Sequence, residues 1–129
     1  MPLVKQGKFR EYYNKCEEIV NEAQKCHDEN FSEDGYYDGD EYVFSGYFYE
    51  VDFIYCEAVK LKTRLESLLE VSEQKTKKSI EKCEKSIKDL DQAIDMCIED
   101  FRSVYDSFNN DFSDMERDTF GNYEIYKVI

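Results

Sequence analysis

Five cysteines and one histidine are the side chains of this sequence that could bind a metal ion or act as nucleophile and base. Four of them, Cys16, Cys26, Cys83 and Cys97, recur on apolar stripes with spacings of three and four. A cysteine on such a stripe is usually a small buried side chain. A zinc site needs paired ligands, as in C-x-x-C, and only Cys26 and His27 are adjacent. The spacing therefore predicts buried thiols, with no metal and no cofactor.

The remaining reactive candidates are Cys56 and His27. Cys56 lies off the apolar stripe, but no basic residue between Lys25 and Lys60 is present to lower its pKa. His27 is the only possible partner for a catalytic thiol, and it stands beside Asp28 near the end of a predicted helix, where we expect a solvated side chain. Neither phosphate-binding glycine motif, G-x-x-x-x-G-K-[ST] or G-x-G-x-x-G, occurs. We therefore expect that this protein is not an enzyme.

Residues 34–45 resemble a calcium-binding loop only in part. Asp34 and Asp38 would occupy loop positions 1 and 5. Tyr36 stands at position 3 and Ser45 at position 12, where such a loop needs a second carboxylate and a bidentate glutamate. The pattern therefore predicts no calcium site.

Composition limits the class of partner. The chain has 129 residues, the size of one domain, and 41% of them are hydrophobic, enough for a buried core. The formal net charge of −13 repels nucleic-acid phosphates and anionic membranes. We therefore expect no direct contact with nucleic acid or membrane, and a basic protein as partner. No signal peptide or membrane-spanning run is visible and the cysteine count is odd, so we expect a cytoplasmic protein.

Three segments carry apolar residues at alternating spacings of three and four, which predicts helices at about 5–28, 43–72 and 78–110. The intervening sequence NFSEDGYYDGDE is a loop by its Gly, Asp and Asn content. The predicted fold is all-α, a single domain (1–129) forming an antiparallel three-helix bundle with an acidic loop and a short C-terminal appendage at 111–129.

Within that appendage, Ser113 and Glu116 have the spacing of a helix-capping box, and Gly121 stands where a short helix would end. The final NYEIYKVI alternates like a strand, and we expect it to dock as an extended segment or stay loose.

Two alternatives to this fold remain open. The linker SEQKTKKS contains no Gly or Pro, so the second and third helices could be one continuous helix of about 70 residues, on the order of 100 Å long. We predict a turn at 72–79 instead, because a hairpin lets one chain bury its own stripes. The second alternative is an α+β fold with a small β-hairpin at 36–48, where strand-forming residues flank DG and SG dipeptides.

Charge is distributed unevenly along the chain. Residues 26–57 contain ten acidic and no basic residues, and residues 91–129 contain ten acidic and three basic ones. Residues 58–90 contain nine basic and six acidic residues. In an antiparallel hairpin the two acidic blocks meet at one end of the bundle, and the lysine-rich turn lies at the other. The sequence therefore predicts a strongly dipolar molecule.

The stretch YYDGDEYVFSGYFYEVDFIY, residues 36–55, combines nine aromatic and five acidic residues. A helical stripe buries only some of these rings; the others could pack on another segment or on a second copy. Exposed rings among carboxylates are typical of an interface with a basic partner, because rings provide buried area and carboxylates provide attraction. The residues that we predict to contact a partner are Tyr36, Tyr37, Asp38, Asp40, Glu41, Tyr49, Glu50, Asp52, Phe53, Asp95, Glu99 and Asp100.

These features favour a non-enzymatic acidic protein that docks on a basic, nucleic-acid-binding surface of another protein and inhibits or regulates it. By analogy, small acidic helical proteins that imitate nucleic-acid charge act in this way, and many belong to phages or mobile elements that block host defence nucleases. An immunity or antitoxin protein would share the same surface. The alternative is an oligomeric coiled coil, a structural or adaptor protein whose stripes pair between chains as in a homodimer.

Overall fold

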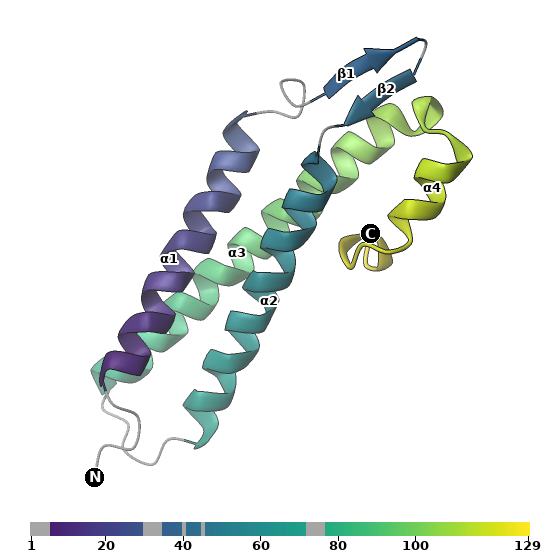
Figure 1. Cartoon of the computed structure of the whole chain (residues 1–129). Coiled ribbons are helices and arrows are strands. Elements are labelled where there is room, and N and C mark those ends of the chain that lie inside the picture. The colour runs from purple at the N-terminus through teal and green to yellow at the C-terminus, as the bar shows by residue number, and fades with distance from the viewer. Residues whose placement is uncertain (1–5, 30–34, 40, 45, 72–76) are drawn as a thin grey trace.

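The computed structural model describes residues 6–29, 35–39, 41–44, 46–71 and 77–129, with backbone alone for 6–10, 29, 35–38, 41–44 and 71. In this part of the chain the elements are α1 (Gln6–Glu29), β1 (Gly35–Asp38), β2 (Glu41–Phe44), α2 (Tyr47–Val71), α3 (Lys77–Phe108), η2 (Asn109–Asp111), α4 (Asp114–Phe120) and η3 (Ile125–Lys127). Figure 1 shows α1, α2 and α3 packed side by side, with α2 running opposite to the other two. The predicted helical bundle is confirmed.

The chain reverses direction between α2 and α3, so the predicted hairpin is confirmed and a continuous helix is excluded. α2 ends at Val71, α3 begins at Lys77, and the two pack against each other along their length. The physical reason lies in the apolar stripes. Leu65 of α2 and Leu90 of α3 are both fully buried, and burying one such side chain contributes about 1.5–3 kcal/mol.

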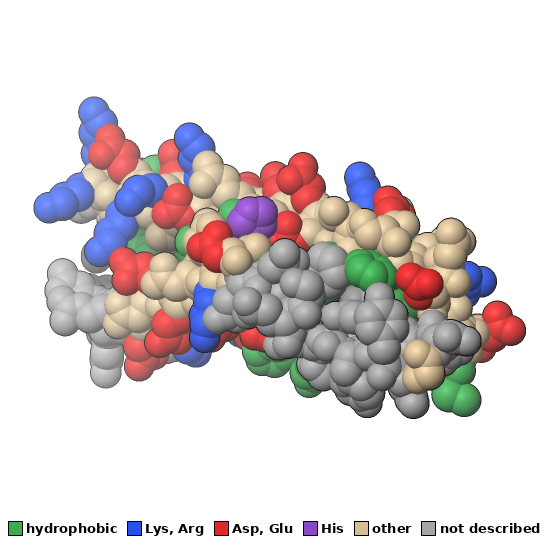
Figure 2. Space-filling view, turned by 90° about the horizontal axis from the view of Figure 1, so that it is seen from above, with side chains coloured by type: hydrophobic (Ala, Val, Ile, Leu, Met, Phe, Trp, Pro, Cys, Tyr) green, Lys and Arg blue, Asp and Glu red, His purple; other side chains and the backbone are tan. Residues whose placement is uncertain are grey.

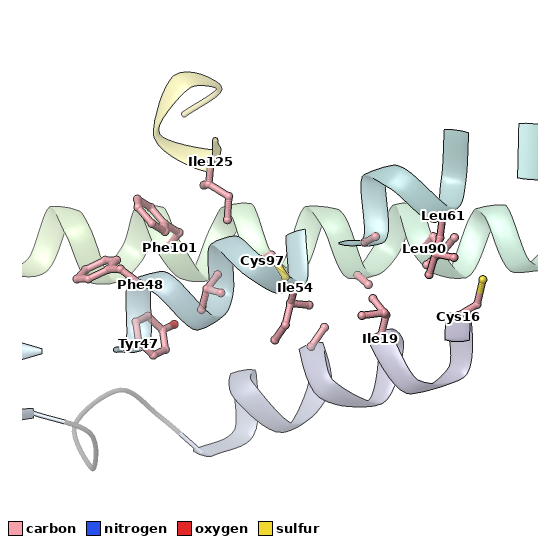
Figure 3. Packing of buried hydrophobic residues seen from close by; sticks show 14 of the residues in the cluster. Cys16, Ile19, Tyr47, Phe48, Ile54, Leu61, Leu90, Cys97, Phe101 and Ile125 are labelled. Atoms are coloured by element: carbon pink, nitrogen blue, oxygen red, sulfur yellow. The ribbon is translucent and has the colours of Figure 1, made fainter. Parts of the chain in front are cut away.

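The main core lies between the three long helices. Cys16 and Ile19 come from α1, Ile54 and Leu61 from α2, and Leu90 and Cys97 from α3, and their side chains turn toward one another (Figure 3). The 3-4 spacing places these positions on one face of each helix.

A second part of the core is aromatic and holds the C-terminal appendage. The ring of Phe48 at the start of α2 lies 4.9 Å from that of Phe101 on α3 and 4.8 Å from that of Phe120 on α4, in edge-to-face geometry. Phe112 and the fully buried Ile125 join the same cluster. The C-terminal residues therefore dock in helical turns, and the expectation of an extended or loose tail is wrong.

The segment between α1 and α2 contains a small antiparallel β-hairpin, in which Tyr36 pairs with Val43 and Tyr37 with Tyr42. The structure thus includes the β-element of the alternative fold beside the predicted bundle. The predicted helix start at residue 43 is wrong, because residues 43–44 belong to β2. Gly46, with φ of 88°, separates strand from helix, and α2 begins at Tyr47. That φ favours glycine.

The predicted N-terminus of the short helix is confirmed. The Ser113 hydroxyl accepts a hydrogen bond of 3.2 Å from the backbone N–H of Glu116, and α4 begins directly after Ser113. α4 ends at Phe120, before Gly121, which has the right-handed φ of −60°.

Candidate partner-binding surface

An exposed aromatic pair lies on the outer face of α2. Tyr49 is 65% exposed and Phe53 is 49% exposed. The pair is exposed because α2 turns Val51 and Ile54 into the core, and successive helix residues are about 100° apart. Glu50, next to Tyr49, is also exposed. Tyr49, Glu50 and Phe53 together are called the α2 outer patch below, and all three belong to the predicted set.

Asp52 belongs to the same helix but faces inward. Its Oδ1 accepts a hydrogen bond of 2.9 Å from the backbone N–H of Ile125, so it holds the C-terminal turn η3. Burial raises the pKa of the Asp52 carboxyl, and the N–H donors of Ile125 and Glu124 partly oppose that rise. The structure therefore gives Asp52 an intrachain contact.

Asp100 also makes an intrachain contact. Its carboxylate lies 2.9 Å from Nδ1 of His27, which joins the end of α1 to α3. The hydrogen bond to Asp100 is the main cause that raises the pKa of His27. His27 was expected to be a solvated side chain; it is 48% exposed, but it is ion-paired as well. Sequence reasoning missed this contact because its partners are 73 residues apart.

The other predicted residues belong to α3 and to the β-hairpin. Asp95 and Glu99 are exposed on α3. Tyr36, Tyr37, Asp38 and Glu41 are placed by their backbone in the β-hairpin, at the end where α2 begins (Figure 1). Asp40 lies outside the described residues.

The two ends of the bundle differ in charge. Lys and Arg side chains gather at the left of Figure 2, over the end where α1 and α3 begin. Five lysines lie in the first part of α3, at positions 77, 78, 82, 85 and 88. We call the end that carries the β-hairpin, the start of α2 and the last part of α3 the acidic end; its described carboxylates include Asp28, Glu50, Asp52 and Asp100.

Three of the four cysteines on the apolar stripes are buried, as predicted. The fourth, Cys26, is partly buried. Cys16, Cys83 and Cys97 are each 3% exposed or less. Burial raises the pKa of Cys16 to about 11 and that of Cys97 to about 12, so both are neutral thiols at physiological pH. Cys56 is partly buried, and burial together with Asp52 raises its pKa too.

Within the described part of the chain, no group of three or more His, Cys, Asp or Glu side chains is arranged to hold a metal ion. None of the described helices combines the length and the apolar character that crossing a membrane requires. In comparisons with protein families, with curated proteins and with solved structures, nothing matches this chain.

Proposed function

We propose that this chain is a non-enzymatic binding protein that docks on a basic, nucleic-acid-binding surface of a partner protein and inhibits or regulates it. The observation that carries the proposal is the α2 outer patch, where Tyr49 and Phe53 are exposed beside Glu50 at the acidic end.

Exposed rings at this position have no role in the core, since α2 already buries four residues within the same two turns: Tyr47, Phe48, Val51 and Ile54. An aromatic ring that enters a partner's pocket contributes a large apolar area, and rings of this kind often dominate binding energy. The surrounding carboxylates favour a basic partner and accelerate the encounter with it. Because the same charge repels phosphates, a protein is favoured over nucleic acid.

The apolar stripes favour binding over the structural alternative. A coiled-coil oligomer needs stripes that remain open for a second chain. Here the stripe residues Ile54, Leu65 and Leu90 are at most 2% exposed within a single chain. We therefore expect a monomer by light scattering.

The test uses the full chain as immobilised bait in a lysate of its native host. Proteins that it retains at low salt and releases at high salt are identified by mass spectrometry, purified, and tested for binding to duplex DNA and to RNA. We expect that the retained protein binds nucleic acid. We also expect that this chain and the nucleic acid compete for the retained protein.

Two bait variants with equal charge change make the result specific. The first, Glu50→Gln with Glu99→Gln, should weaken capture strongly, and adding Tyr49→Ala and Phe53→Ala should abolish it. The control, Glu81→Gln with Glu84→Gln, changes two exposed carboxylates at the lysine-rich end and should capture normally. Equal capture by all baits, or simultaneous binding of this chain and nucleic acid, would overturn the proposal.

A further inference from the structure

The packing of α1 against α3 places cysteines of both helices in or against the same core. Each helix carries two cysteines on its inward stripe: Cys16 and Cys26 on α1, and Cys83 and Cys97 on α3. Because the two helices run in the same direction (Figure 1), the order of the cysteines along them pairs Cys16 with Cys83 and Cys26 with Cys97.

A side-chain contact places the part of α1 that contains Cys26 beside the part of α3 that contains Cys97. His27 Nδ1 lies 2.9 Å from Asp100 Oδ1. His27 directly follows Cys26, and Asp100 is less than one helical turn beyond Cys97. Cys97 is a member of the buried core, and Cys26 packs against that core. Cys26 also contributes, after burial, to the raised pKa of Cys97, which agrees with two thiols close together.

The two pairs of cysteines, Cys16 with Cys83 and Cys26 with Cys97, differ in how accessible they are to reagents. Cys16 and Cys83 are 3% and 2% exposed, and the Cys83 thiol points to the carbonyl oxygen of Leu65 at 3.7 Å. Such thiols are shielded from reagents. Cys26, in contrast, is only partly buried, so a small oxidant can reach it.

We infer that Cys26 and Cys97 form a redox-dependent crosslink that joins the end of α1 to α3. The oxidant is a hydroperoxide. The Cys26 thiol loses its proton, and the thiolate attacks one peroxide oxygen. The O–O bond breaks, the sulfenic acid forms, and the departing alkoxide or, from hydrogen peroxide, hydroxide takes up that proton as an alcohol or water. The Cys97 sulfur then attacks the Cys26 sulfur, the S–O bond breaks, and the departing hydroxide takes the Cys97 proton as water. Two thiols are oxidised and one peroxide is reduced.

The crosslink would act on the acidic end of the molecule. It closes a loop between residues 26 and 97, which contains the β-hairpin, α2 and the first part of α3. A covalent loop of this kind reduces the freedom of the unfolded chain. We therefore expect the oxidised protein to melt at a higher temperature than the reduced one. This inference does not depend on the proposed function.

The experiment treats the full chain carrying Cys56→Ser with hydrogen peroxide, because trypsin would otherwise leave residues 26 and 56 on one peptide. Peptide mapping without reductant should show the peptide that begins at Cys26 joined to the one that contains Cys97, and dithiothreitol should separate them and return the melting temperature to its reduced value. Adding Cys16→Ser should leave the link intact, whereas adding Cys26→Ser should abolish it.

The mapping is made on a protein whose four core-stripe cysteines are unchanged, so the result does not depend on whether a core variant folds. A Cys16–Cys83 link that forms as readily, peroxide oxidation of Cys26 to sulfinic acid without a link, or a link between two chains alone would each overturn the inference.

Discussion

At the scale of single residues, the carboxylates of the acidic end are of two kinds, those with an intrachain contact and those that are exposed. Asp52 and Asp100 make intrachain contacts, with the N–H of Ile125 and with His27 respectively. Glu50 and Glu99 are exposed. Substitution of the first kind should affect stability, and substitution of the second kind should affect binding.

Replacing Asp52 separates its charge from its role as hydrogen-bond acceptor. Asp52→Ala leaves the Ile125 N–H without its acceptor, which typically costs about 1–3 kcal/mol. Asp52→Asn keeps an acceptor oxygen and removes a charge whose burial is unfavourable, so it should cost less at neutral pH. Hydrogen exchange checks this: the Ile125 amide should lose protection in Asp52→Ala and keep it in Asp52→Asn. Equal loss in both variants would contradict the contact.

The pair of His27 and Asp100 should make stability depend on pH. The pKa of His27 is raised above 6.5 in the folded chain. The stabilising contribution is therefore fully present below about pH 6.5 and is lost as the pH rises through the folded value. We expect the imidazole to titrate above 6.5 by NMR, and nearer to 6.5 in Asp100→Asn. A His27 pKa that is the same in both proteins would show that Asp100 is not the cause. The effect on stability should be small because His27 is half exposed.

At the scale of elements, packing in the aromatic cluster decides how the C-terminal appendage docks on the bundle. Phe120 is 5% exposed and contacts the rings of Phe48 and Phe112 at 4.8 and 4.7 Å. α4 is a short helix and would be marginal in isolation, so its stability depends on this contact.

Phe120→Ala should therefore destabilise the fold by about 3–5 kcal/mol. Phe53→Ala is the matched control, because it removes the same ring from a half-exposed position and should change stability by about 0.5 kcal/mol or less. Urea unfolding followed by circular dichroism measures both. Similar midpoints for the two variants would show that α4 does not pack on the bundle.

At the scale of the whole molecule, the net charge of −13 makes the folded state electrostatically unfavourable at low ionic strength. Raising sodium chloride from about 20 to about 300 mM shortens the Debye length to below 10 Å and should raise the urea midpoint. Lowering the pH from 8 toward 5 should act in the same direction, because the pKa values of Asp52 and His27 are both raised. A midpoint that falls with salt would indicate that attractive pairs, such as Lys62 with Asp91 at 2.6 Å, dominate over repulsion.

The sequence by itself determined the parts of the structure that depend on neighbouring residues along one helix. The 3-4 spacing of apolar residues predicted three helices and their inward faces, and Ser113 with Glu116 predicted the start of α4. These features are local, since each depends on the period of the helix or on one capping contact.

Tertiary structure alone decided the rest. Phe44 continues the apolar spacing of the second helix yet belongs to β2, because pairing with β1 outweighs a pattern that both structures can satisfy. The contacts of Asp52 with Ile125 and of His27 with Asp100 each span 73 residues. No local pattern encodes such a contact, because it depends on how far two packed helices are shifted along each other. The same shift decides which carboxylates of α3 make contacts with α1 and which stay exposed.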